Sequence, residues 1–293
     1  MGELLLAMAD EVGKGHRPDR LAAHYEERYR EHDPRIGPGG RAGARAFWTD
    51  LLRGFPDLSL QVDLMLTDQD RVMAFLTWRG TRAGPYGGVD GDGRRLELRT
   101  SELFRLGADG RIAEHWAVVD YSVLSEFGVL PRGAAVPAAL AGPTLAGPHG
   151  RTERANIEVV LGAYREVMSG HRLERADAYY ARDYLNHNAQ MPAVPNGVAA
   201  FKEYFAGNFA AFPDLTVSVE HLVAAGDLVM VFAVWRGHFT GVSRGRRPTG
   251  KRLEMRTSDQ FRIAGGKVVE HWEVVDYSGL QNAGIPVRPL PTA

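Results

Sequence analysis

The chain has 293 residues with a formal net charge of −1, and 44% of its residues are hydrophobic. This length suggests about two domains, and the composition is typical of a globular protein rather than a disordered one. A net charge near zero gives no reason to expect binding to nucleic acid or to an anionic membrane surface. Cysteine is absent, which excludes disulfides, thiolate metal sites and a cysteine nucleophile.

The N-terminal segment does not fit a targeting signal. Its apolar run is short and is flanked by Glu3 and Asp10, which is unlike a signal-peptide core. Leu6 occupies the place that a myristoylation pattern gives to Ser or Thr. No stretch of the sequence approaches the roughly 18 apolar residues of a membrane-spanning helix. We therefore expect a soluble, cytoplasmic protein.

Four blocks of sequence occur twice, in the same order. The pairs are 15–33 with 170–188, 55–80 with 212–237, 94–106 with 251–263, and 110–124 with 266–280. The offset between the two copies changes by only one or two residues from block to block. Such self-similarity over the whole chain indicates a tandem duplication.

Each repeat is long enough to be a domain of its own rather than a solenoid unit. We predict a first domain at residues 1–130 and a second at 151–293. The segment between them, 131–150, is rich in Pro, Gly and Ala, which is typical of a linker. We expect the two domains to associate as a pseudo-dimer within one chain, and we leave open a further homo-oligomer.

Within a repeat, helices precede strands. In the second copy, helical spacing and the stop at Pro213 predict helices over 152–171, 172–180 and 198–212. Strand patterns separated by Gly-bearing turns follow at 215–223, 227–239, 252–263 and 267–277. Helices packed on one side of a curved antiparallel sheet make an α+β domain.

The third predicted strand alternates cleanly between two faces. Met255, Thr257 and Asp259 share the face that also carries large apolar side chains, so we expect them to point inward. Glu102 takes the place of Asp259 in the first copy. A carboxylate on an inner face is costly unless it is paired or neutralised, which makes these positions candidates for chemistry.

For the last strand, the same alternation predicts that Trp272, Val274 and Asp276 point inward. A hairpin that turns near Gly265 would place Asp259 opposite Trp272. The carboxylates of Asp259 and Asp276 would then lie roughly 13 Å apart, too far for a shared proton but suited to bracketing a substrate. Two interpretations of Asp276 stay open: a pocket acid or base, or a residue that ends the strand and caps its neighbour.

The motifs YLNHN, FPDL, WRGHFTG, PTGK, RTSDQFR and GKVVEHWEVVD resemble those of the SnoaL-like polyketide cyclase family. The resemblance covers nearly all of 155–280 and, more loosely, 15–124. It implies the cone-shaped fold of nuclear transport factor two, and hence two tandem cone-shaped α+β barrel domains. This fold hosts many chemistries, so the fold alone does not define a reaction.

The resemblance also implies site residues. In the family's cyclases an Asp on the last strand is the general acid/base of an intramolecular aldol ring closure, which corresponds to Asp276 and, in the first copy, to Asp120. A second Asp on the preceding strand corresponds to Asp259, with Glu102 as its counterpart. The characterised cyclases have a His two residues further on, where this chain has Phe261.

Further pocket candidates come from both copies, with His187 as a possible catalytic residue and the others as substrate-binding residues. They are His187, Tyr184, Asn188, Trp235, His238, Met255, Thr257 and Trp272, with His32, Trp78 and Trp116 in the first copy. A histidine that follows a helix is more often a structural residue than a functional one. We place the active site in the second copy because the first has Thr81 in place of His238 and lacks PTGK.

The function favoured by these residues is a cofactor-independent acid/base enzyme acting on a small, polyketide-like carbonyl compound. Ring closure, isomerisation, dehydration and epoxide opening by a hydrolase would all use the same groups. The rival hypothesis is a non-catalytic module that binds a small molecule. No HxH or HExxH spacing and no Gly-rich phosphate loop occur, so we expect neither a metal nor a nucleotide cofactor.

Overall fold

The computed structural model describes residues 2–33, 36–37, 39–127, 144–145, 147–187, 197–243 and 245–285. The chain divides into two compact units, Met1–Val136 and Pro137–Ala293. Only residues 144–145 and 147–150 of the predicted linker are among those described. The exact domain boundaries therefore stay predictions.

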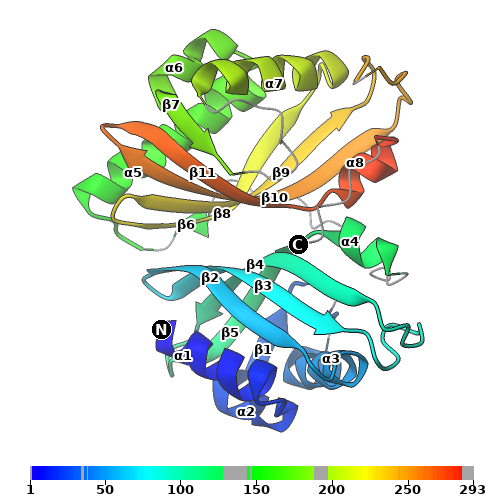
Figure 1. The fold of residues 1–293 in the computed structure, drawn as a ribbon. Helices are drawn as coiled ribbons and strands as arrows, with labels where there is room; N and C mark the ends of the chain where they lie inside the picture. The colour runs from blue at the N-terminus through cyan, green and yellow to red at the C-terminus, as the bar shows by residue number, and fades with distance from the viewer. Residues whose placement is uncertain are drawn as a thin grey trace. The chain divides into compact units, whose positions relative to one another are not determined.

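The first unit is built on a five-stranded sheet (Figure 1). Its helices are α1 (Gly2–Met8), a π-helical turn (Ala9–Lys14), a 3₁₀ turn (Pro18–Arg20), α2 (Leu21–His24), α3 (Gly40–Gly54) and α4 (Tyr121–Glu126). Its strands are β1 (Tyr25–Glu31), β2 (Ser59–Asp68), β3 (Arg71–Thr81), β4 (Arg95–Leu106) and β5 (Ile112–Val119). The strand order is β1-β5-β4-β3-β2.

The second unit repeats this plan. Its helices are α5 (Arg151–Gly162), a π-helical turn (Ala163–Ser169), a 3₁₀ turn (Leu173–Arg175), α6 (Ala176–Tyr179), α7 (Val198–Ala211) and α8 (Ser278–Ala283). Its strands are β6 (Thr144–Leu145), β7 (Tyr180–Asn186), β8 (Thr216–Ala225), β9 (Leu228–His238), β10 (Arg252–Ala264) and β11 (Lys267–Val275). They form a sheet in the order β6-β8-β9-β10-β11-β7.

The predicted α+β architecture is confirmed, with one addition. Helices α6 and α7 cover one face of the sheet of the second unit, as α2 and α3 do in the first (Figure 1). The strands β7 and β1 were not predicted, and they pair in parallel with β11 and β5, so both sheets are mixed rather than purely antiparallel. Their buried residues recur every fourth position (Tyr180 and Tyr184 in β7), which hides the two-residue period that marks a strand.

The hairpin between β10 and β11 fixes which side chains reach the interior. Gly265 and Gly266 both have positive φ, as a two-residue type I′ turn requires. Pairing then begins with Ala264 opposite Lys267, but Arg262 pairs with Glu270 while Ile263 pairs with Val268. Val269 is thus the extra residue of a β-bulge. Beyond it, every residue of β11 lies on the opposite face from that expected for an unbroken hairpin.

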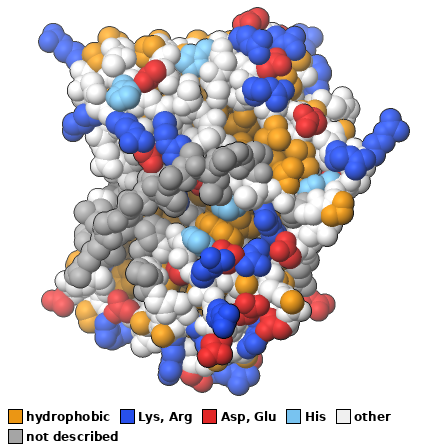
Figure 2. Space-filling model, turned by 180° about the vertical axis from the view of Figure 1, so that it is seen from behind, with side chains coloured by type: hydrophobic (Ala, Val, Ile, Leu, Met, Phe, Trp, Pro, Cys, Tyr) orange, Lys and Arg blue, Asp and Glu red, His pale blue; other side chains and the backbone are white. Residues whose placement is uncertain are grey.

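Among the described residues, no helix has the length and apolar character needed to cross a bilayer. Basic and acidic side chains are interspersed over the face shown in Figure 2, in keeping with the net charge of −1.

Candidate active site

The second unit contains a cavity of about 820 Å³, part of it open to solvent, between helix α7, the π-helical turn after α5 and the inner face of the sheet. Ten of its 22 lining residues are Tyr, Phe or Trp. Apart from the tyrosines, the polar lining residues are Asn186, Asn208, Thr257, Asp259, His271 and Glu273. An aromatic wall with a few convergent polar groups is typical of a small-molecule site.

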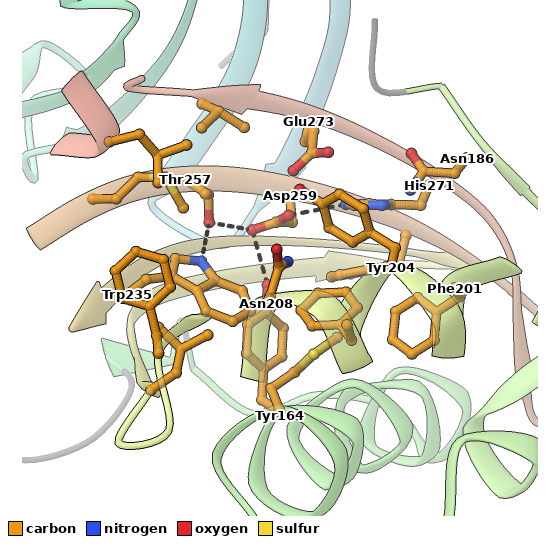
Figure 3. Close-up of a pocket in the computed structure, with 18 of the residues that line it drawn as sticks. Tyr164, Asn186, Phe201, Tyr204, Asn208, Trp235, Thr257, Asp259, His271 and Glu273 are labelled. Atoms are coloured by element: carbon orange, nitrogen blue, oxygen red, sulfur yellow. Dashed lines mark hydrogen bonds and ion pairs between the residues drawn. The ribbon is translucent and has the colours of Figure 1, made fainter. Parts of the chain in front are cut away.

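Asp259 lies at the centre of a hydrogen-bond network on β10 (Figure 3). Its Oδ2 accepts hydrogen bonds from the hydroxyls of Thr257 at 2.6 Å and Tyr164 at 2.8 Å. Its Oδ1 lies 2.9 Å from Nε2 of His271, and Trp235 donates to the Thr257 hydroxyl at 3.0 Å. Only 3% of Asp259 is exposed, so these donors replace the solvent that a buried carboxylate loses.

His271 extends the network to the far side of the cavity. Its Nδ1 lies 2.9 Å from the hydroxyl of Tyr184, and its ring stacks on Phe261 at 4.7 Å between centroids. Burial lowers the pKa of His271, but the hydrogen bond with Asp259 and the charge of Glu273 outweigh it, so the net pKa is raised. The site therefore favours an imidazolium between two carboxylates.

Glu273 is the carboxylate that faces the cavity on β11, next to the Asp259–His271 pair. It is partly exposed, and one ligand atom from each of Asp259, His271 and Glu273 lies within 4.8 Å of the others. Among the described residues these three form the set that could hold a cation. Asp259 Oδ1 and His271 Nε2 are hydrogen-bonded to each other, so an ion held by these two atoms would have to displace that bond.

The predictions for β10 and its neighbours agree with the structure. Met255, Thr257 and Asp259 line the cavity, as the alternation in the third strand predicted. Trp235 on β9 and Tyr184 on β7 line it too. Their roles in catalysis or binding remain predictions.

The register predicted for the last strand is wrong. His271, Glu273 and Val275 line the cavity, whereas Trp272 and Asp276 are not among the described lining residues. The bulge at Val269 is the cause, because one extra residue moves each later side chain to the other face. Asp276 instead accepts a hydrogen bond from the backbone of Ser278, at the start of α8, at 3.1 Å.

The histidines proposed for the pocket of the second unit also lie elsewhere. His187 is exposed, stacks on Trp272 at 4.9 Å and lies 2.8 Å from Glu270. His238 is exposed and lies 2.7 Å from Asp214. Neither lines the cavity. Asn188 lies outside the described residues.

In the first unit, Asp120 serves as a helix cap. It is the N-cap of α4 and accepts hydrogen bonds from the amide of Ser122 at 3.0 Å and from its hydroxyl at 2.6 Å. His32 stacks on Trp116 at 4.5 Å, as His187 does on Trp272. In both copies, the histidine therefore packs against the tryptophan of the last strand.

Glu102 is buried in the first unit and is not among the lining residues of the cavity described there. Its Oε2 lies 2.7 Å from Nε2 of His115, whose Nδ1 lies 2.9 Å from Glu31. The first unit's own cavity is smaller, at about 340 Å³, and its eight lining residues are Leu, Phe, Tyr or Trp, including Trp78. No carboxylate is among the described residues that line it.

Most of the lining residues were not proposed from sequence, among them Tyr164, Asn208, His271 and Glu273. A comparison of the two repeats could have identified two of these positions. Glu273 corresponds to Ala117 and Asn208 to Leu51, so the second copy is polar where the first is apolar. Such a difference between two copies of one fold indicates that the fold does not require the polar residue at that position.

The comparisons with known proteins agree with this layout. The family model described as SnoaL-like polyketide cyclase matches twice, at residues 3–126 and 158–283. No match is found among curated proteins.

Several solved structures resemble one half of the chain. A proposed SnoaL-like polyketide cyclase from Jannaschia sp. CCS1 is 25% identical, with a TM-score of 0.43 over 49% of this chain and all of its own. IdmH, a proposed polyketide cyclase from Streptomyces antibioticus, is 28% identical, with a TM-score of 0.40 over 44% of this chain and 99% of its own. AclR, a proposed hydroxylase from Streptomyces galilaeus, is 26% identical, with a TM-score of 0.39 over 44% of this chain and 96% of its own. Because the family model matches most of the chain in two consecutive copies, this protein belongs to the SnoaL-like polyketide cyclase family.

Proposed function

We propose that the second unit is a cofactor-independent acid/base enzyme of the polyketide cyclase type, with Glu273 as its general base. One observation carries the proposal. Glu273 presents a partly exposed carboxylate to an aromatic cavity, within 4.8 Å of the Asp259–His271 pair. A carboxylate held in such surroundings is suited to removing a proton next to a carbonyl group.

The proposed reaction needs a single proton carrier. Glu273 takes the proton from the carbon next to a carbonyl, and the C–H electron pair becomes an enolate. The enolate carbon attacks a second carbonyl of the same molecule, forming the ring C–C bond and an alkoxide. The protonated Glu273 then returns its proton to the alkoxide, so no external acid, oxidant or metal is consumed.

Asp259 and His271 act as positioning residues in this proposal. Both carboxylate oxygens of Asp259 are already engaged, by Thr257, Tyr164 and His271. Asp259 is also almost fully buried, whereas Glu273 is partly exposed and therefore more accessible to a substrate. Asp259 stabilises the imidazolium form of His271, which places a positive charge next to the carboxylate of Glu273.

Deuterium exchange tests proton abstraction without knowledge of the natural substrate. The protein is incubated in D₂O with 2-tetralone, a bicyclic ketone with acidic C–H bonds, and exchange is followed by NMR. We expect exchange above the buffer rate, and we expect Glu273→Gln to slow it by about 10²-fold or more. EDTA should leave the rate unchanged.

Glu254→Gln is the matched control, because Glu254 lies on β10 in ion pairs with Arg236 and Arg252 and does not line the cavity. This variant should catalyse deuterium exchange of the ketone at the rate of the unmodified protein. If the protein binds the ketone without accelerating exchange, the acid/base proposal fails and the binding-module hypothesis takes its place. Equal exchange by Glu273→Gln would exclude Glu273 as the base.

A further inference from the structure

Asn208 is one of the polar residues that line the cavity. It lies on α7, and its amide points into the cavity (Figure 3). Within the described part of the chain it has no hydrogen-bond partner for that amide. The indole of Trp235 and the hydroxyls of Tyr164 and Thr257 are all committed to bonds inside the protein.

The fold does not require an asparagine at this position. The corresponding residue of the first unit is Leu51, which lines the smaller, apolar cavity there. A leucine on α7 would complete the apolar wall, whereas Asn208 places a partly buried amide in it, and partial burial of an amide without a protein partner is unfavourable. Asn208 is therefore better explained by a ligand than by packing.

The charges around the cavity narrow the class of ligand. Asp259 and Glu273 are acidic, and no Lys or Arg is among the described lining residues. His271 offsets one of the two negative charges. A carboxylate or phosphate on the ligand would meet net repulsion in a medium of low dielectric constant. The aromatic walls favour a flat, apolar molecule.

We propose that Asn208 anchors an uncharged, planar aromatic ligand by donating a hydrogen bond from its amide to a carbonyl oxygen of that ligand. The inference rests on the proposed function and extends it. The oxygen held by Asn208 on the helix side of the cavity would be the one that becomes the enolate oxygen when Glu273 removes a proton from the sheet side. A donor placed at that oxygen stabilises the charge that develops there.

Three matched probes test this assignment: 9-fluorenone, fluorene, which lacks the carbonyl, and 9-fluorenone-2-carboxylate, which adds a charge. Binding is followed by quenching of tryptophan fluorescence, since Trp235 lines the cavity. We expect the protein to bind fluorenone about three- to tenfold more tightly than fluorene, as one neutral hydrogen bond allows. The carboxylate should bind most weakly.

Asn208→Leu introduces the residue of the first unit and should remove the preference for fluorenone while leaving fluorene binding intact. Asn208→Asp, which keeps an oxygen and loses the donor, should also remove the preference. Glu203→Gln, at an exposed position of the same helix, should behave like the unmodified protein.

Two results would overturn the assignment: a preference for fluorenone that survives Asn208→Leu, or an equal loss of fluorenone and fluorene binding. Tighter binding of the carboxylate would overturn the charge argument. These outcomes are separate from those of Glu273→Gln, which is judged by exchange rate. The experiments can therefore contradict the role of Asn208 and still support Glu273 as the general base, or the reverse.

Discussion

His115 on β5 and His271 on β11 occupy equivalent positions in the two units, but different side chains surround them. In the first unit His115 lies between Glu31 and Glu102, at 2.9 and 2.7 Å, and all three side chains are almost fully buried. In the second unit Asn186 replaces Glu31, and His271 bonds with Asp259 and with Tyr184 instead.

A further carboxylate distinguishes the second unit. Glu273 faces its cavity where the first unit has Ala117. In the first unit, therefore, the charged groups around His115 are buried in the core. In the second unit, the carboxylate of Glu273 lines an aromatic cavity. After duplication, one copy can retain the fold with its site sealed while the other keeps a chemically accessible one.

The largest expected effect is the loss of stability in His115→Leu. Removing the imidazolium would leave the carboxylates of Glu31 and Glu102 buried without a counter-charge, which costs about 3–5 kcal/mol. His271→Leu should cost less, because Asp259 keeps the Tyr164 and Thr257 hydroxyls as donors. Urea unfolding of the two variants measures both losses, and losses of equal size would contradict the contrast between the units.

The stability supplied by His115 should depend on pH. Burial lowers its pKa, but the charge of Glu31 and the hydrogen bond with Glu102 outweigh this and raise the pKa to about 10. Because the folded-state pKa exceeds the unfolded value, about 6.5, this stabilisation is complete below pH 6.5 and is lost as the pH rises through 10.

The difference in unfolding free energy between the unmodified protein and His115→Leu should therefore shrink between pH 6 and pH 10.5, a range of roughly four pH units. Unfolding curves recorded across this range provide the check. A constant difference would mean that His115 is not charged in the folded protein.

Asp259→Asn and Glu102→Gln form the next pair. We expect Asp259→Asn to slow ketone deuteration by on the order of tenfold to a hundredfold. It should also move the pH dependence of exchange, since it removes a cause of the raised pKa of His271. Glu102→Gln should leave exchange unchanged and lower only stability. A slower rate in Glu102→Gln would show that the first unit takes part in the reaction.

The smallest effects are expected at the two aspartates that follow the last strands. Asp120→Ala removes the N-cap of α4 and should cost about 1 kcal/mol. Asp276→Asn should leave the exchange rate within about twofold of normal, because Asp276 does not line the cavity and general-base loss would cost far more. A hundredfold slower exchange in Asp276→Asn would instead support the general acid/base role that the family resemblance implies for Asp276.

Much of the fold could be predicted from the sequence. The duplication, the helix-then-strand order and the inner face of β10 followed from repeats and alternation, because β10 is continuous through Met255, Thr257 and Asp259. The Gly265–Gly266 turn was also visible, since only such residues readily adopt the positive φ of a tight hairpin. These features depend on local backbone preferences and on short periods along the chain.

The full set of residues of the site could be identified only from the tertiary structure. A single bulged residue, Val269, exchanged the faces of β11 and brought Glu273 rather than Asp276 to the cavity. Nothing local in that strand marks the bulge, because both registers bury apolar side chains. Likewise, Tyr164 and Asn208 come from helices remote from β10 and β11 in the chain, and only the packing of those helices on the sheet decides that they meet Asp259 and Glu273 around one cavity.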